Sequence, residues 1–421
     1  MKRTLVATIA LLVFLIGGQS MAPAQSAIEV ASSTATSAFP NGIRFQLQAI
    51  ADAAFDDVRL IYMIAPDGVR NTRLPQCNGT TTVTCTAQLS GGPRDTIIPG
   101  AEITYFWRII SGGATQETEP QQITYEDSRF DWKTLTEDNM TLWYYSGSED
   151  GARSVLEAAY ESEQQSSALL QTTVDYPVKV FLYATAEDMQ PAILSDNDEG
   201  VVTRGEVVYS DTAMVAADTA PEEIARHEIA HIVQRAALKG AYEAPDWAIE
   251  GMAVYMQSQP LGGQRDAIES AIRSGQVLSV RSMSSASSGA ISGNVFLFYG
   301  EAWSLVKFLI DTYGDQKFGD FFRAIDAGAG DTGSLQQVYG FNQDGLENAW
   351  RESVGLPPRT AATPEDSDAV PASTSDDVAS PSTSDDSDTN VVLIVGIIAV
   401  TVVIAGSLLG LGVYVARRLN W

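Results

Sequence analysis

Residues 219–235 read TAPEEIARHEIAHIVQR, and this stretch decides the fold of the second half of the chain. Pro221 suits the first turn of a helix, where its missing N–H costs nothing. Thr219 and Glu222 have the spacing of a capping box, which also marks a helix start. We therefore expect a helix over about 221–238.

The two histidines of this stretch carry the main indication of chemistry. His227 and His231 stand four residues apart, so a helix presents both imidazoles on one face, where they can bind one zinc ion. Glu228 follows the first histidine directly and is placed to act as a general base on a water at that metal. The chain of 421 residues contains no other histidine. This favours a metal site over a helix that carries two ordinary histidines.

A catalytic zinc needs a third protein ligand and an open fourth position. Residues 245–255 read PDWAIEGMAVY, in which Glu250 is an acid within an otherwise apolar run. Burying a lone carboxylate is costly unless it is paired or coordinates a metal. Glu250 is therefore the preferred third ligand, with Glu243 and Asp246 as alternatives in the connection and at the helix start.

Taken together, these motifs resemble a known family. His-Glu-Ile-Ala-His, then eighteen residues, then Glu250 within Trp-x-x-Glu-Gly-x-Ala-x-Tyr is similar to the gluzincin metallopeptidases, above all to peptidase MA-like domains of exported bacterial proteins, and shares its spacing with the aminopeptidase N family. Residues 299–314 and 346–350 resemble the C-terminal helices of those domains, and the likeness covers about residues 135–356. It implies a zincin-like fold that hydrolyses peptide bonds of a polypeptide substrate with Zn²⁺ as cofactor.

The resemblance also implies roles for individual residues. It implies three zinc ligands and a general base, namely His227, His231, Glu250 and Glu228. Gluzincins commonly add a tyrosine or histidine that hydrogen-bonds the oxyanion of the reaction. Since no histidine is left, Tyr299 is the candidate for this role, with Tyr255 second.

Two departures from the family pattern limit what it implies. The Gly-x-Met-Glu-Asn segment that anchors the substrate's amino terminus in aminopeptidases is absent, and residues 205–209 read GEVVY instead. The resemblance therefore does not imply aminopeptidase specificity. The position four residues after Glu250, an aspartate in thermolysin-like enzymes, is Val254, so the group that orients the first histidine is unidentified. By analogy with zincin architecture, a strand at about 207–209 is expected to pair with an extended substrate.

The fold class expected for the whole chain is α+β, with a β-rich and a mostly helical part. Residues 28–127 show short runs of alternating polar and apolar residues between turn signals, typical of an immunoglobulin-like β-sandwich domain. Cys77 and Cys85 lie eight residues apart and can form a local disulfide. Residues 130–358 are expected to form the zincin-like peptidase domain. Its expected strands are 142–145, 178–183, 201–203 and 207–209, and its expected helices are 154–170, 221–238, 246–257, 264–273, 298–313, 318–326 and 343–353.

The two ends of the chain predict export and anchoring. Residues 1–24 have the basic start and apolar run of a signal peptide. Residues 361–390 are acidic and of low complexity, as expected of a disordered stalk. Residues 391–416 carry no charge and are long enough for a transmembrane helix, with a cytoplasmic tail at 417–421. The sequence thus predicts a single-pass protein of the cell membrane whose N-terminal bulk is extracellular.

The charge balance narrows the class of partner. The chain has 53 Asp plus Glu against 26 Lys plus Arg, a formal net charge of −27. Nucleic acid is not an expected partner, because phosphate binding needs clustered bases. The leading hypothesis is a membrane-anchored extracellular zinc metallopeptidase. The alternative is a non-catalytic surface binding protein, or an inactive relative with a structural zinc site. Nothing in the sequence indicates an oligomeric state.

Overall fold

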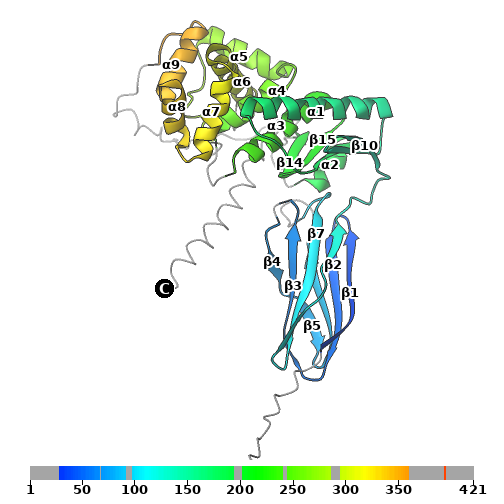
Figure 1. The fold of residues 1–421 in the computed structure, drawn as a ribbon. Helices are drawn as coiled ribbons and strands as arrows, with labels where there is room; N and C mark the ends of the chain where they lie inside the picture. The colour runs from blue at the N-terminus through cyan, green and yellow to red at the C-terminus, as the bar shows by residue number, and fades with distance from the viewer. Residues whose placement is uncertain are drawn as a thin grey trace, which may run out of the picture.

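The structure is a computed structural model that describes residues 28–66, 68–91, 97–193, 202–239, 244–285, 294–359 and 393–394. Figure 1 shows a strand-rich N-terminal part beneath a larger part with most of the helices. The predicted signal peptide, acidic stalk and cytoplasmic tail lie outside the described residues.

The N-terminal part consists of antiparallel strands in two sheets. Its strands are β1 (Ile28–Ala38), β2 (Gly42–Ala51), β3 (Phe55–Ile64), β4 (Asn71–Arg73), β5 (Gln76–Gly79), β6 (Thr82–Leu89), β7 (Glu102–Ser111), β8 (Ala114–Glu117) and β9 (Gln121–Thr124). One sheet has the order β1-β2-β6-β5, and the other has the order β4-β3-β7-β8, with β9 also paired to β7. The apolar residues of the alternating runs face a shared core, in which Phe45 of β2 packs edge to face against Tyr105 of β7.

This arrangement corrects the expected immunoglobulin-like sandwich. The described strands form two open sheets of four and five strands. Alternation in the sequence shows that a strand has one buried face, but it does not determine how strands are divided between sheets. The local disulfide is present, since Cys77 of β5 and Cys85 of β6 are direct cross-strand partners and are bonded.

The second part contains one mixed sheet. Its strands are β10 (Lys133–Glu137), β11 (Met140–Tyr144), β12 (Val178–Tyr183), β15 (Thr212–Ala216) and β14 (Gly205–Tyr209), in that spatial order. The central strands β11, β12 and β15 are parallel, whereas β10 and β14 are antiparallel edge strands. All six residues of β12 are buried, as expected for a central strand covered on both faces.

Helices cover this sheet and continue beyond it. They are α1 (Glu149–Leu170), α2 (Ala186–Met189), α3 (Pro221–Ala237), α4 (Asp246–Met256), α5 (Gly262–Ser274), α6 (Val295–Tyr313), α7 (Asp315–Asp326), α8 (Gly330–Tyr339) and α9 (Gln343–Ser353). Apolar residues of α1 and α3 pack on one face of the sheet, and α2 with the short 3₁₀ helix Gln190–Ala192 packs on the other. The helices α4 to α9 then gather beside α3 (Figure 1).

A buried lysine joins the two parts of the molecule. Lys179 lies on β12 and is 7% exposed. Its Nζ donates to the carbonyl oxygen of Gly100 at 3.2 Å and lies 2.9 Å from Oε1 of Glu102, both in the N-terminal part. It also lies 3.1 Å from Oδ2 of Asp211 in the second part. The charge of Lys179 is therefore neutralised by groups from both parts.

The expected C-terminal membrane helix is not supported. No helix within the described ranges is long and apolar enough to cross a membrane. Inside the expected span of 391–416, the two described residues form strand β16 (Leu393–Ile394), which pairs in parallel with β13 (Val202–Thr203), and the remaining residues lie outside the described ranges. This corrects both the expected transmembrane helix and the cell-membrane localisation that depended on it. The apolar run alone does not distinguish a spanning helix from other structure.

Candidate metal centre

Helix α3 presents the two histidines. It runs from Pro221 to Ala237, close to the expected 221–238. The expected capping box is wrong, because the N-cap residue is Ala220, in a left-handed conformation with φ of 43°, and no side chain caps the helix. Pro221 does occupy the first turn. The helix forms largely because its apolar face is buried against the sheet and α1.

Helix α4 brings the third side chain to this face of α3. It runs from Asp246 to Met256 and is apolar on nearly all sides, with Glu250 buried in its middle. Gly251 explains how closely α4 approaches α6. A Cβ at Gly251 would lie 2.3 Å from the carbonyl oxygen of Ala302 in α6, a contact that side chains do not make. The glycine therefore fixes the depth at which its neighbour Glu250 sits.

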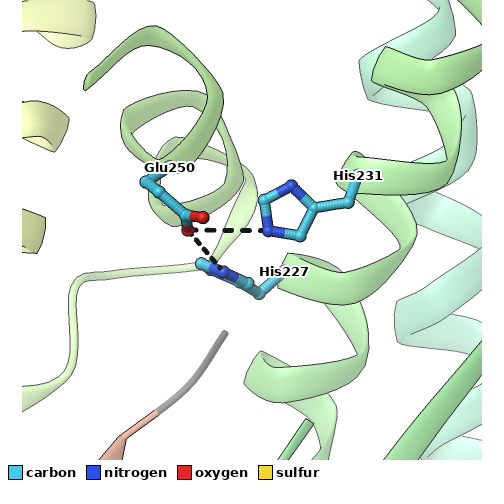
Figure 2. Close-up of side chains that lie close together, drawn as sticks. All are labelled: His227, His231 and Glu250. Carbon is cyan, nitrogen blue, oxygen red and sulfur yellow. Dashed lines mark ion pairs between the residues drawn. The ribbon is translucent and has the colours of Figure 1, made fainter. Parts of the chain in front are cut away.

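Three ligand atoms converge between these helices (Figure 2). Oε2 of Glu250 lies 3.3 Å from Nε2 of His227 and 3.6 Å from Nε2 of His231. Ligand atoms of the three residues all lie within 4.8 Å of one another. Atoms that bind one zinc at about 2.0–2.1 Å in a tetrahedron are about 3.3–3.4 Å apart. The spacing therefore suits a single metal ion.

Several polar atoms of this cluster are buried and have no hydrogen-bond partner among the described residues. Nε2 of both histidines and Oε2 of Glu250 are inaccessible to solvent and meet no hydrogen-bond geometry. Nδ1 of His227 and Oε1 of Glu228 are also buried and form no hydrogen bond with the described residues. Buried polar atoms are ordinarily satisfied, because an unpaired one costs about 1–3 kcal/mol. A cation among the three ligand atoms would remove this cost, so the residues present fit a metal.

The electrostatics of the site also favour a positive charge. Burial lowers the pKa of His227. For His231, burial acts in the same direction but is outweighed by the carboxylates of Glu250 and Glu228, which raise its pKa. Burial raises the pKa of Glu228 to about 8, opposed by His231 and reinforced by Glu250 and Glu206. Burial would also raise the pKa of Glu250, but the two imidazoles outweigh it and lower that pKa to about 2.

Glu228 lies against the edge strand β14. A Cβ at Gly205 would lie 2.5 Å from Oε1 of Glu228 and 2.6 Å from Cγ2 of Ile224. Only glycine allows the backbone of β14 to pass this close to the carboxylate. Glu228 is thus held between α3 and the strand, 1% exposed, beside the three ligand atoms.

Of the two tyrosines considered, Tyr299 lies at the cluster. Its ring centroid is 6.0 Å from that of His227, and its hydroxyl lies near the Glu250 carboxylate. Burial and the nearby negative charges raise its pKa well above the usual value, so the phenol remains a proton donor. Tyr255 lies elsewhere, where burial and the charges of Asp311 and Asp315 raise its pKa.

The alternative third ligands do not join the cluster. Among the described residues, the one group of acidic, histidine or cysteine side chains close enough to hold a metal consists of His227, His231 and Glu250. Asp246 is not a member of it. Glu243 lies outside the described residues.

Gln234 is a site residue that sequence reasoning missed. Its Oε1 lies 2.9 Å from Nδ1 of His231, and its Nε2 donates to the carbonyl oxygen of Ile249 at 2.8 Å. Because Oε1 of Gln234 accepts this hydrogen bond, the proton of His231 is on Nδ1, and Nε2 is available to bind a metal. The available signal was a glutamine three residues after His231, directly after the apolar Ile232 and Val233.

Comparison with known families agrees with this geometry. Residues 162–355 match the family model of the Peptidase MA superfamily. The matched segment begins within α1 and ends just after α9, so it includes both histidines, Glu250 and Tyr299. No curated protein matches the chain. Residues 162–355 therefore form a gluzincin-like domain of the Peptidase MA superfamily.

Proposed function

We propose that the protein is a zinc-dependent peptidase that hydrolyses peptide bonds at the cluster of His227, His231 and Glu250. The observation that carries this proposal is the convergence of Oε2 of Glu250 with Nε2 of both histidines, at 3.3 and 3.6 Å. Membership of residues 162–355 in a superfamily of peptidases supports a polypeptide as substrate.

The donor set favours zinc among the common metals. Two imidazoles and one carboxylate are a frequent ligand set of catalytic zinc, which keeps a fourth position for water or substrate. Magnesium and calcium prefer oxygen ligands alone. Two histidines and a carboxylate can also hold non-haem iron(II), but two histidines four residues apart on one helix, with Glu228 directly after the first, are the pattern of zinc peptidases. A bound zinc ion would polarise the substrate carbonyl and lower the pKa of a water molecule.

Glu228 is proposed as the general base. A group with a pKa near the working pH both accepts and releases protons efficiently, and burial brings Glu228 into this range. Its carboxylate takes a proton from the water whose oxygen attacks the scissile carbonyl carbon. The same proton then passes to the leaving amine as the carbon–nitrogen bond breaks.

Tyr299 is proposed to stabilise the negative charge that develops on the carbonyl oxygen. Its hydroxyl is at the Glu250 carboxylate and close to His227, so it borders the position where the reacting carbonyl must lie. A preorganised donor of this kind acts strongly in a buried site, where water does not compete.

The test is the substitution Glu228→Gln, which keeps the size of the side chain and removes the base. We expect the variant to retain zinc by elemental analysis while peptide cleavage falls by about 10²–10⁴-fold. Glu222→Gln is the matched control, because Glu222 lies in the first turn of the same helix, away from the cluster. That control should leave both zinc content and cleavage unchanged.

Two outcomes would overturn the proposal. Cleavage by Glu228→Gln at the wild-type rate would reject Glu228 as the base. A zinc-loaded wild-type protein that cleaves nothing in a broad peptide library would reject the peptidase. It would favour instead the non-catalytic binding protein with a structural metal.

A further inference from the structure

The outer edge of β14 is the backbone that an extended peptide would meet beside Glu228. β14 is the last strand in the order β10-β11-β12-β15-β14. Within the described ranges, no strand pairs with its outer side. At its start, the backbone of Gly205 passes so close to Glu228 that a Cβ there would lie 2.5 Å from Oε1 of Glu228. Unpaired strand edges are common docking sites for extended peptides.

The register of β14 determines which groups point outward. The amide of Ala216 donates to the carbonyl oxygen of Arg204 at 2.8 Å, so residue 204 faces β15. In an antiparallel pair, successive residues alternate between facing the partner strand and facing away from it. Gly205 and Val207 therefore direct their N–H and C=O groups to the outer edge.

Arg235 occupies part of that edge. Its Nη1 donates to the carbonyl oxygen of Tyr209 at 3.0 Å, and its Nη2 donates to that of Val207 at 3.4 Å. Arg235 follows His231 by four residues on α3 and thus lies on the same face of the helix. The guanidinium covers the end of β14 that lies away from Glu228. A substrate that paired with residues 207–209, as expected from the sequence, would compete with Arg235 for these two carbonyls.

We propose that Arg235 limits how far a substrate can pair along the outer edge of β14 and thereby restricts cleavage to peptide bonds near a chain end. This inference rests on the proposed peptidase function. Among the described residues, no hydrogen bond engages the outward N–H and C=O of Gly205 or the outward N–H of Val207. A peptide residue opposite Gly205 has two further residues, about 7 Å of strand, before it reaches the capped carbonyl of Val207. The chain can thus extend by only about two residues on that side of the site.

The chemistry of the guanidinium makes this end hard to displace. An arginine remains charged at all working pH values and holds two acceptors at once with its planar fork. A peptide amide that replaces it gains a neutral hydrogen bond, whereas the guanidinium loses its two charge-assisted bonds to the carbonyl oxygens of Val207 and Tyr209. Such an exchange costs about tenfold or more in binding.

The experiment measures kcat/KM for two sets of peptides around one cleaved bond. One set is lengthened residue by residue on the amino side, and the other on the carboxyl side. For the wild type, we expect kcat/KM to fall at least tenfold on one side beyond about two residues, and to stay level on the other. The readout is the ratio of kcat/KM for a long peptide to kcat/KM for a short one. This ratio does not depend on the fraction of a variant that is active.

Arg235→Met keeps the length of the side chain and removes its donors, so the ratio for the long peptide should rise at least tenfold. Arg235→Lys, which keeps one charged group and serves if the methionine variant is unstable, should give an intermediate ratio. Arg226→Met is the matched control on α3, where the arginine pairs with exposed Glu161, and should leave the ratio unchanged.

The outcomes separate the two proposals. A wild-type enzyme that cuts long and short peptides equally on both sides overturns the role of Arg235 and leaves the peptidase standing. A length limit that persists unchanged in both Arg235 variants also overturns it. A zinc-loaded wild type that cuts no peptide of any length overturns the peptidase itself.

Discussion

Gln234 offers the sharpest test of how this site is built. It accepts a hydrogen bond from Nδ1 of His231 and donates one to the carbonyl oxygen of Ile249, the residue before Glu250. One side chain therefore connects a ligand on α3 to the backbone next to the ligand on α4. Gln234→Leu keeps nearly the same volume and removes both bonds.

The expected effect can be worked from these contacts. Two buried hydrogen bonds of about 1 kcal/mol each predict a loss of about 2 kcal/mol in the free energy of unfolding of the metal-free protein. Partners that orient a ligating histidine typically contribute about 10–100-fold to metal affinity. Zinc affinity should fall by that factor, roughly 1.4–2.7 kcal/mol.

Zinc affinity would be measured by competition with a chromophoric chelator at fixed pH, and stability by urea unfolding of the metal-free protein. Gln257→Leu is the matched control. Gln257 is also a buried glutamine that connects the end of α4 to α3, through the carbonyl oxygen of Glu223, but it does not touch a histidine. It should lose stability and keep zinc affinity. Zinc binding by Gln234→Leu within twofold of the wild type would refute the reasoning.

Two further predictions concern α6. Tyr299→Phe removes the proposed oxyanion donor, so zinc content should persist while kcat falls about 10²–10³-fold. The control Tyr255→Phe should leave kcat unchanged. Equal kcat values for Tyr299→Phe and the wild type would exclude Tyr299 from the mechanism. Glu301 is fully buried and accepts from the amide of Leu278, and burial raises its pKa to about 8. Because the folded pKa exceeds the ordinary value of 4.5, this group's contribution to stability is complete below about pH 4.5 and is lost as the pH rises to about 8. We expect urea unfolding between pH 5.5 and 7.5 to show that the free energy of unfolding of Glu301→Gln rises relative to that of the wild type, by up to about 1.4 kcal/mol per pH unit. If the two free energies changed with pH in parallel, the raised pKa of Glu301 would be contradicted.

Elements with strong local patterns could be predicted from the sequence. The strand over Val178–Tyr183 and the helix over Gln343–Ser353 are confirmed at the expected bounds, since one is apolar apart from Lys179 and the other has clear helical periodicity. Strand β15 was not expected, because Thr212–Ala216 is short and shows no alternation. Helix α8 was also missed, since Gly330–Tyr339 begins with weak helix formers.

In the candidate site too, the features set by local sequence could be predicted and those set by tertiary packing could not. The relation of His227 to His231 is set within one helix, so the spacing alone predicts that both imidazoles share a face. The approach of Glu250 depends on how α4 packs, and the sequence indicated it only through the cost of burying an acid. The contacts of Gln234 and Arg235 depend on elements far apart in the chain. No local pattern in the sequence encodes them.

The lysine between the two parts has an evolutionary consequence. The ammonium of Lys179 is balanced by a carbonyl and a carboxylate of the N-terminal part and by one carboxylate of the peptidase part. A lineage that exchanged residues 28–127 for an unrelated module covering the same surface would leave a buried cation with Asp211 as its single partner. Such a change would be tolerated only with a compensating substitution at Lys179. We therefore expect an exchange of the N-terminal part to be accompanied by a change at Lys179.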